Sequence, residues 1–240
     1  MSELIFVRHG QASFGSESYD KLSELGVEQV KILAQHWQAL GERFDCIYSG
    51  TLLRQRETAY ELFGLVEGSP SSSIQLPGLN EYNGDPLISI YLRDHADADG
   101  FGSASGKPQQ LPISDERLFQ TIFESATEKW IKGELQPSAE DSKFEYWTDF
   151  QTRVYSAIDD IMEQQGKGSR VLISTSGGVI AMALQRVLQF PDQHVINTNW
   201  MVRNSSVTRV IYGNGRMSLT QFNCLAHLEK ADLQHMITFR

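Results

Sequence analysis

Short runs of apolar residues alternate along this chain with longer segments in which apolar residues recur every three or four positions. The first pattern is typical of strands buried in a sheet, and the second is typical of helices with one buried face. The short runs predict strands at residues 4–7, 44–48, 74–76, 170–174, 207–212 and 217–222. The recurring positions predict helices at residues 27–40, 52–63, 118–130, 154–161 and 179–188.

The order of these elements predicts the class of fold. Strands that alternate with helices favour an α/β three-layer sandwich, with a mostly parallel central sheet of about six strands and helices on both faces. The last two predicted strands are joined through Gly213-Asn214-Gly215. Because an Asn-Gly step is the strongest short hairpin signal, we expect these two strands to pair directly with each other.

The regular pattern weakens between residues 85 and 147. Within this stretch, residues 95–112 are poor in apolar side chains and rich in Gly, Ser and Asp, which is typical of a loop. Ser114 or Asp115 can then cap the helix that follows. We therefore expect a single domain over residues 1–240 that carries a helical and loop insert, or lid, at about 85–147.

The balance of charges and the few cysteines narrow the range of partners. With 30 acidic and 21 basic side chains, the 240 residues carry a net charge of −9 at pH 7. A surface of that sign repels nucleic acid and anionic lipid, so neither is expected as a general partner. No apolar run is long enough for a membrane span, and no targeting segment is expected at the N-terminus. Cys46 and Cys224 are isolated from each other in sequence, which predicts two reduced thiols and a cytoplasmic location.

Polar residues that suit a phosphate ligand stand at several junctions between predicted strands and helices. Ligands of α/β sheets bind beyond the carboxyl ends of the strands, so these residues are expected to converge. They are Arg8 and His9 after the first strand, Arg54 near the start of the helix that follows the second, Glu81 in a turn, and Ser176, Gly177 and Gly178 before the helix at 179–188.

Such a set contains the groups that phosphoryl transfer requires. Guanidinium forks match phosphate oxygens, and exposed N–H groups at the start of a helix bind anions. An imidazole can attack phosphorus to give a phosphohistidine, which divides one difficult transfer into two easier ones. A carboxylic acid can protonate the leaving oxygen and later activate water. The sequence has no HExxH motif and no cluster of Asp and His, so we predict no metal site and no cofactor.

Four motifs, in a fixed order, resemble those of the histidine phosphatase superfamily, whose fold is shared with cofactor-dependent phosphoglycerate mutases. The first is a strand followed by Arg-His-Gly, and the second joins Tyr-Ser to Leu-x-Arg-x-x-x-Thr-Ala. The third is Leu-x-Glu, and the fourth combines Asn-x-Ser-Val-Thr with Phe-Asn and His-Leu. In this chain they are Ile5–Gly10, Tyr48–Ser49 with Leu52–Ala59, Leu79–Glu81, and Asn204–Thr208 with Phe222–Asn223 and His227–Leu228.

The resemblance implies a role for each matching residue. His9 would be the residue that becomes phosphorylated, with Arg8 and Arg54 holding the phosphate and Glu81 acting as the proton donor. Because Arg56 lies about 200° from Arg54 around the helix, we interpret it as a solvated surface charge. The alternative for Glu81 is that its carboxyl group only caps backbone N–H groups at the turn.

The chain departs from the family pattern after the strand at 170–174. Ser176 stands where the family has its second catalytic histidine, and Gln11 stands where the family usually has a glutamate. We expect Ser176, Gly177 and Gln11 to contact the substrate. A serine hydroxyl donates one hydrogen bond but carries no charge, and losing such a donor typically costs about 2.7–4 kcal/mol, or 10²–10³ in rate. His95, in the insert, is a candidate substitute for the missing imidazole, although a surface histidine is the simpler interpretation.

These features lead to one preferred function and two alternatives. The preferred function is a metal-independent phosphomonoester hydrolase that acts through a phosphohistidine on a small phosphorylated metabolite. The first alternative is phosphoryl transfer of the phosphoglycerate mutase type. The second is a catalytically impaired protein that binds a phosphorylated ligand or serves as a scaffold, because the second histidine is replaced by Ser176. The oligomeric state stays open, with a homodimer as one alternative.

The other histidines and the aromatic residues of the insert have simpler interpretations. The remaining histidines lack partners at ligand spacing and are expected to be structural, with a buried hydrogen bond as one role for His227. The aromatic residues are expected to pack within the core or the insert, with a substrate platform as the alternative. The residues in question are His36, His194, His227 and His235, and Trp130, Phe144, Tyr146 and Trp147.

Overall fold

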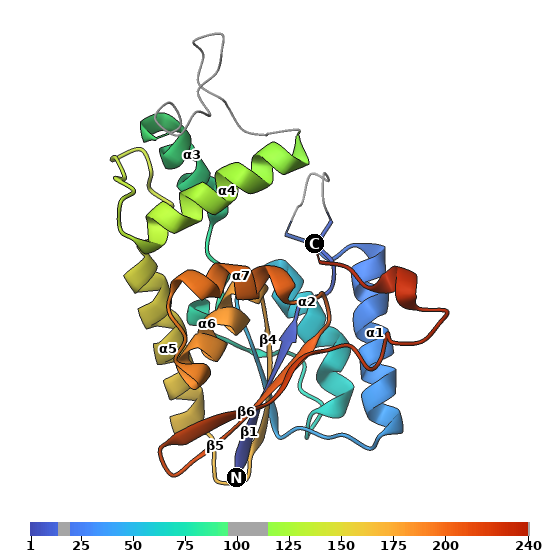
Figure 1. Cartoon of the computed structure of the whole chain (residues 1–240). Helices are drawn as coiled ribbons and strands as arrows, with labels where there is room; N and C mark the ends of the chain where they lie inside the picture. Colours follow the sequence, from blue (N-terminus) through green and yellow to red (C-terminus); the bar gives the residue numbers. More distant parts are fainter. Residues whose placement is uncertain (14–19, 96–114, 240) are drawn as a thin grey trace. The chain divides into compact units, whose positions relative to one another are not determined.

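The computed structural model describes residues 1–13, 20–95 and 115–239, so most of the predicted loop at 95–112 lies outside the described residues (Figure 1). The chain divides into two compact units. The first unit combines Met1–Glu81 with Arg153–Arg240, and the second is Tyr82–Thr152. The second unit contains the described part of the stretch at 85–147 in which the sequence pattern weakens.

The first unit is built on a six-stranded sheet with the strand order β3-β2-β4-β1-β5-β6. Strands β1, β2, β3 and β4 run parallel to one another, whereas β5 pairs antiparallel with β1 and β6 pairs antiparallel with β5. This arrangement confirms the predicted α/β class and the mostly parallel sheet. The strands are β1 (Ser2–Arg8), β2 (Cys46–Ser49), β3 (Ile74–Gln75), β4 (Arg170–Thr175), β5 (Val207–Gly213) and β6 (Arg216–Cys224).

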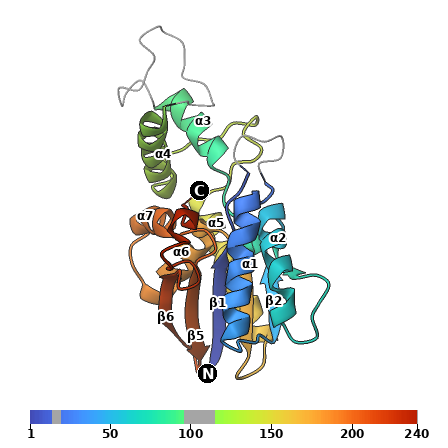
Figure 2. The same cartoon turned by 90° about the vertical axis from the view of Figure 1, so that its right-hand side faces the viewer.

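Helices cover both faces of this sheet, as Figures 1 and 2 show: α1 and α2 lie against one face, and α5 and α6 lie against the other. Residues of α5 from Arg153 onward belong to the first unit. Helix α7 was not predicted from the sequence, because Val195 and Ile196 are its only two buried residues and give no periodic pattern. The helices are α1 (Glu24–Ala39), α2 (Leu53–Leu62), α5 (Trp147–Gln164), α6 (Gly177–Leu188) and α7 (Gln193–Met201).

The hydrophobic core between the sheet and the α1/α2 layer follows from the alternation of side chains along a strand. Ile5 and Val7 point to the same face of β1, where they join Val30, Leu33 and Trp37 of α1 in one buried cluster. The predicted hairpin is also present, since Asn214 and Gly215 have φ values of 52° and 72° between β5 and β6. Positive φ at both central residues is what a two-residue hairpin turn requires.

A close contact between backbones brings the end of β1 against the start of α1. A Cβ atom added to Gly10 would lie 2.2 Å from the carbonyl oxygen of Gly26, and one added to Gly26 would lie 2.1 Å from that of Gln11. Since no side chain fits at either position, both must be glycine. This contact fixes the chain immediately after His9.

The second unit has an aromatic core. It contains α3 (Gly84–Asp94), α4 (Glu116–Ile131) and the first residues of α5. The ring of Trp130 lies 5.0 Å from those of Tyr82 and Trp147 and 5.8 Å from that of Phe150, measured between centroids. Trp130 and Trp147 are therefore packing residues, as the simpler interpretation proposed, whereas Tyr146 is exposed.

The starts of α3 and α4 are set by side-chain caps. Asp115 Oδ1 accepts hydrogen bonds from the backbone N–H groups of Arg117 (2.9 Å) and Leu118 (3.0 Å), which confirms Asp115 as the cap of α4. Helix α3 was not predicted, because Asn83-Gly84 was interpreted as a turn. In the structure Asn83 Oδ1 accepts from the N–H of Asp85 (3.1 Å), so the turn residues cap a helix.

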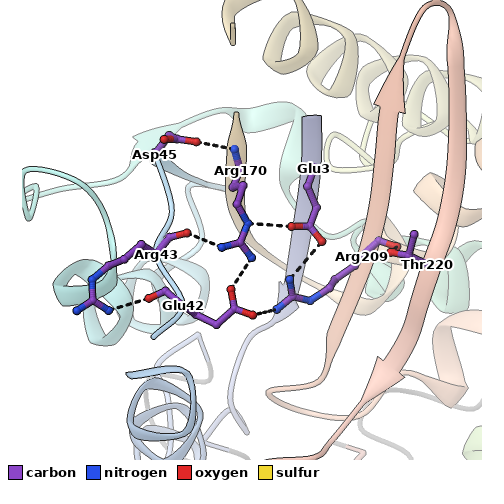
Figure 3. A network of polar contacts seen from close by, with 7 residues as sticks. All are labelled: Glu3, Glu42, Arg43, Asp45, Arg170, Arg209 and Thr220. Carbon is purple, nitrogen blue, oxygen red and sulfur yellow. Dashed lines mark hydrogen bonds and ion pairs between the residues drawn. The ribbon is translucent and has the colours of Figure 1, made fainter. Parts of the chain in front are cut away.

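Four charged side chains form a closed ring at the amino-terminal ends of β1 and β4 (Figure 3). Arg170 donates to Glu3 (3.1 Å) and Glu42 (2.5 Å), and Arg209 donates to the same two carboxylates (3.2 and 3.1 Å). We call Glu3, Glu42, Arg170 and Arg209 the charge ring. It ties three neighbouring strands, β4, β1 and β5, to the segment that follows α1.

Candidate active site

His9 is the first residue after β1, and its side chain is held in one tautomer. The residue is only 6% exposed. Its Nδ1 lies 2.7 Å from the carbonyl oxygen of Gly10, which can only accept a hydrogen bond, so Nδ1 carries the proton. Nε2 is then the unprotonated nitrogen, and it accepts a hydrogen bond from Nε of Arg54 at 3.2 Å.

The surroundings of His9 keep its imidazole uncharged. Burial lowers the pKa of His9 well below 6.5, and the positive charges of Arg54 and Arg8 lower it further. The hydrogen bond to the carbonyl of Gly10 acts in the opposite direction but is outweighed. At neutral pH the ring therefore has a lone pair on Nε2 beside a guanidinium group.

The backbone of His9 is fixed by residues far away in the sequence. Its N–H donates to the carbonyl of Thr175 on β4 (2.8 Å), and its carbonyl accepts from Nδ2 of Asn204 (3.2 Å). The N–H of Ser205 donates to the carbonyl of Arg8 (3.1 Å), with Ser205 in the left-handed region at φ 56°. These bonds hold the nucleophile candidate against the end of the sheet.

His227 holds Ser205, whose N–H binds the carbonyl of Arg8, through a side-chain hydrogen bond. Its Nε2 lies 2.9 Å from the hydroxyl oxygen of Ser205, and the residue is buried. Burial lowers the pKa of His227 to about 3, and the neighbouring His36 acts in the same direction. The predicted buried hydrogen bond of His227 is thus present.

Arg54 lies at the start of α2 and makes an ion pair that the sequence did not reveal. Its Nη1 is 2.5 Å from Oδ1 of Asp20, while Oδ2 of Asp20 accepts from the N–H of Leu53 (2.7 Å). Asp20 therefore caps α2 and orients the Arg54 guanidinium at once. No periodic or motif signal marks Asp20, because its partners lie more than 30 residues further along the chain. Arg56 is exposed on the same helix, as predicted.

Arg8 and Glu81 are both held by backbone groups. Nη1 of Arg8 donates to the carbonyl of Val202, which precedes β5. Oε2 of Glu81 accepts from the N–H of Gly178 in the first turn of α6 (2.9 Å). The carboxyl group of Glu81 thus does bind a backbone N–H at a helix start, as the alternative interpretation anticipated. The same bond fixes this carboxyl group beside the residues that follow β4.

Ser176 lies directly after β4 and is fully buried. Its hydroxyl oxygen accepts a hydrogen bond from Nε2 of Gln55 (2.9 Å), and the same nitrogen donates to the carbonyl of Leu79 (3.0 Å). The hydroxyl of Thr175 donates to that carbonyl as well (2.7 Å). Gln55 is fully buried on α2 and was given no role from the sequence, because its burial and its partners exist only in the assembled fold.

Gln11 and Gly177 make contacts within the protein. Oε1 of Gln11 accepts from the hydroxyl of Ser23, the residue that caps α1 (3.0 Å). A Cβ atom added to Gly177 would lie 2.2 Å from Oδ1 of Asn199 on α7, so a side chain here would displace the Asn199 amide. Their predicted contacts with a substrate stay predictions.

The geometry therefore joins His9 directly to Arg54, and it links Ser176 to α2 through Gln55. The family model described as the histidine phosphatase superfamily (branch 1) matches residues 4–90 and 114–225, which are most of the chain. The protein belongs to the histidine phosphatase superfamily.

Solved structures of other proteins have the same fold as this chain. A phosphoserine phosphatase mutant from Entamoeba histolytica in complex with phosphoserine superimposes with a TM-score of 0.62 at 19% identity, covering 95% of this chain and 100% of that one. For phosphoglycerate mutase from Bacillus anthracis the TM-score is 0.63 at 22% identity, with 94% of each chain covered. For the alpha-ribazole phosphatase from Shigella flexneri it is 0.62 at 18% identity, with 93% and 97% covered. A search among curated proteins found no match.

The other predicted features of this chain concern His95, a metal site and membrane-spanning helices. His95 belongs to the second unit, where its ring stacks on that of Tyr91 at 6.1 Å between centroids. Among residues 1–13, 20–95 and 115–239, no group of three or more His, Cys, Asp or Glu side chains is placed to hold a metal ion. No helix in these ranges has the length and apolar character to span a membrane.

Proposed function

We propose that the protein is a phosphomonoester hydrolase that works through a phosphohistidine at His9. The observation that carries this proposal is the state of the imidazole, which is buried, uncharged and has its Nε2 lone pair beside the Arg54 guanidinium. An attacking nitrogen needs that lone pair, and a guanidinium can hold the phosphate oxygens at the same place. On substrate binding, the Arg54 N–H would turn from Nε2 to a phosphate oxygen.

The proposed reaction has two steps. In the first, Nε2 of His9 bonds to phosphorus, the bond from phosphorus to the substrate oxygen breaks, and Glu81 gives that oxygen a proton. In the second, water attacks phosphorus, Glu81 takes up a proton from the water, and the bond between phosphorus and Nε2 breaks. Arg8 and Arg54 hold the phosphate oxygens in both steps and supply positive charge, which a metal ion would otherwise provide.

The position of Glu81 supports its role as the proton donor. The N–H of Gly178 binds Oε2, which holds the carboxyl group at one place beside the start of α6. A donor fixed in this way does not lose orientation between the two steps. The same donor can therefore serve both the leaving oxygen and the water.

For the substrate we propose a small phosphorylated metabolite. Structural neighbours include a phosphoserine phosphatase and an alpha-ribazole phosphatase, although their identities of 18–19% support only the shared fold. The net charge of −9 disfavours nucleic acid and anionic lipid as ligands. The insert at 85–147 is proposed to act as a lid that selects among metabolites.

Two other functions each have an observation in their favour. A phosphoglycerate mutase shares the fold, which favours phosphoryl transfer to a second hydroxyl group instead of water. Ser176, in place of the second histidine that the family resemblance implies, favours a protein that binds phosphorylated ligands with little turnover. These alternatives differ from the hydrolase in their products, so one assay separates them.

The test combines turnover with trapping of the intermediate. Wild-type protein, His9→Ala and His194→Ala are incubated with p-nitrophenyl phosphate and with a panel of phosphometabolites in the presence of EDTA. We expect wild type and His194→Ala, which changes an exposed histidine of α7, to release phosphate at equal rates. His9→Ala should lose about 10⁴-fold or more and form no acid-labile phosphoprotein, because the nucleophile is gone.

Three outcomes would contradict the proposal. Turnover that survives in His9→Ala would exclude His9 as the nucleophile. Phosphate that appears on an added alcohol or hydroxy acid acceptor, and not as free phosphate, would favour the mutase. No turnover on the whole panel, together with a melting temperature that inorganic phosphate raises, would favour the binding protein.

A further inference from the structure

The buried amide of Gln55 can adopt only one orientation. One of its two terminal atoms lies 3.0 Å from the carbonyl oxygen of Leu79. A carbonyl oxygen only accepts hydrogen bonds, so the atom facing it must be the nitrogen Nε2. The same nitrogen lies 2.9 Å from the hydroxyl oxygen of Ser176 and donates its second hydrogen to it.

This orientation determines what the Ser176 hydroxyl can do. Nε2 of Gln55 can only donate hydrogen bonds, so the Ser176 oxygen must accept. The hydroxyl proton of Ser176 therefore does not point toward Gln55. Within the described residues, Gln55 is the one side chain that shares a hydrogen bond with this hydroxyl. Ser176 follows Thr175, and Thr175 pairs with Arg8 across the sheet. Ser176 and His9 are therefore the first residues after two neighbouring strands, and both strands end at the same level of the sheet.

The oxygen of the Gln55 amide makes no hydrogen bond to a described residue, so the polar contacts of this side chain come from its nitrogen alone. Oε1 is buried and has no hydrogen-bond partner among the described residues. An apolar side chain of similar size would fill this space without an unsatisfied acceptor. Gly50 makes room for this oxygen, since a Cβ atom there would lie 1.9 Å from it. The protein thus keeps an amide at this position despite the disadvantage of its oxygen.

We propose that Gln55 is a positioning residue that turns Ser176 into a hydrogen-bond donor for the phosphoryl group. The proposal rests on the proposed function, and it names the group that acts at the place of the missing imidazole. Gln55 occupies one acceptor lone pair of the serine oxygen, so the hydroxyl proton points away from Gln55 and is available to the oxygens of a phosphate held at His9. A donor in a buried site acts strongly on developing negative charge because water does not compete with it.

The experiment is a double-mutant cycle with Gln55→Met, Ser176→Ala and the combined variant. For each protein, kcat and KM are measured with p-nitrophenyl phosphate, the Kd of inorganic phosphate by calorimetry, and the melting temperature. Gln185→Met is the matched control, since Gln185 of α6 also donates a side-chain hydrogen bond, to Asp192 (2.6 Å). A role confined to packing would change the melting temperature and leave kcat unaltered.

We expect Ser176→Ala to lower kcat by about 10²-fold, as loss of one donor to the transition state does. Gln55→Met should lower kcat by about 10-fold, and the combined variant should be no slower than Ser176→Ala, because Gln55 acts through the hydroxyl. Multiplied effects in the combined variant, or unchanged kcat and phosphate Kd in Ser176→Ala, would overturn the proposal. If Gln55→Met does not fold, Gln55→Glu replaces it: a carboxylate attracts the Ser176 proton and should lower kcat at least as much as Ser176→Ala does.

The two proposals can fail separately. If the wild-type protein shows no turnover, or if its turnover does not require His9, the hydrolase proposal is wrong. The Kd of inorganic phosphate, measured for the same set of variants, would then test the role of Gln55. Turnover that depends on His9 but not on Ser176 or Gln55 would end only the present inference.

A second pair of variants tests the geometry independently. An imidazole at position 176 needs the space that the Gln55 amide occupies, because Nε2 lies only 2.9 Å from the serine oxygen. We expect Ser176→His alone to lower the melting temperature. Gln55→Ala combined with Ser176→His should recover it and exceed Ser176→His in kcat. A fully stable Ser176→His protein would contradict the packing on which the proposal depends.

Discussion

The two ends of the central sheet contain the same kinds of charged side chain in opposite arrangements. At the amino-terminal ends of the strands, the charge ring joins two guanidiniums to two carboxylates that are 16% and 20% exposed. At the carboxyl ends, the guanidiniums of Arg8 and Arg54 both act on an imidazole that stays uncharged. At the first end each guanidinium is paired with two carboxylates, whereas the second end holds a neutral base beside two guanidiniums, with Arg54 also paired with Asp20.

The difference shows that position along a strand separates structural from candidate catalytic arginines. Arg170 opens β4 and Arg8 closes β1, although both are arginines on neighbouring parallel strands. In the charge ring, burial raises the pKa of Glu42, but the hydrogen bond from Arg170 and the charge of Arg209 outweigh it, so the pKa lies below its usual value. The carboxylate of Glu42 therefore stays charged at neutral pH and keeps its ion pairs with both arginines.

The largest expected effect concerns catalysis at the carboxyl end. If the proposed function is correct, Arg54→Met should lower kcat/KM by about 10²–10³-fold, because one set of the proposed phosphate contacts is lost. The free energy of unfolding should change by about 1 kcal/mol or less, since the partner carboxylate of Asp20 is 40% exposed. Steady-state kinetics and urea unfolding measure the two effects.

Arg56→Met is the matched control for this change, because Arg56 lies exposed two residues further along α2. It should leave both kcat/KM and stability close to those of wild type. Equal kinetic losses in the two variants would show that Arg54 has no special role, and the contrast between the sheet ends would then not extend to function.

An intermediate effect concerns stability at the amino-terminal end. Arg209→Met leaves Glu3 and Glu42 with one guanidinium in place of two, so we expect the free energy of unfolding to fall by about 2 kcal/mol. Because the ring lies at the opposite end of the strands from His9, kcat should stay within about twofold of wild type. A drop in kcat without loss of stability would reverse the comparison.

A last effect, of similar size, concerns the pH dependence of stability. The pKa of His227 is about 3 in the folded protein and 6.5 by default in the unfolded chain. Below pH 6.5, His227 is therefore protonated in the unfolded chain but stays neutral in the native state. The free energy of unfolding consequently decreases as the pH falls from 6.5 toward 3. Between pH 7.5 and 5, this histidine alone should lower the free energy of unfolding by about 2 kcal/mol.

His227→Gln removes this titration, and urea unfolding at the two pH values should show a drop smaller by about that amount. His9 adds to the drop in the same direction, because its pKa is also lowered on folding. Arg209→Met should keep the full drop of the wild type, since the charge ring contains no histidine. An unchanged drop in His227→Gln would show that His227 is protonated in the native state.

The strands and the main helices were predictable because their signals are local. The apolar run at 4–7 and the Asn-Gly step at 214–215 each specify an element within a few residues, and both elements are present. Helix α3 was missed because it begins with Asn83-Gly84, which has the composition of a turn, and because Pro86 is tolerated only within a first turn. The sequence pattern does not show which of two local structures such residues form.

The candidate site divides in the same way. Arg54 and His9 were predicted to lie together, and the hydrogen bond between them is present. Asp20 and Gln55 were not predicted, because their roles depend on partners 34 and 121 residues away in the sequence. Such contacts exist only after the sheet has assembled, so no local pattern contains them.

The contact between Gln55 and Ser176 has a consequence for the natural history of this protein. The amide at position 55 and the hydroxyl at position 176 are complementary in size and hydrogen bonding. An imidazole at position 176 would not fit beside the amide. Relatives should therefore inherit the two residues as a pair, and a lineage that regains histidine at position 176 should have replaced the glutamine with a small residue at the same time.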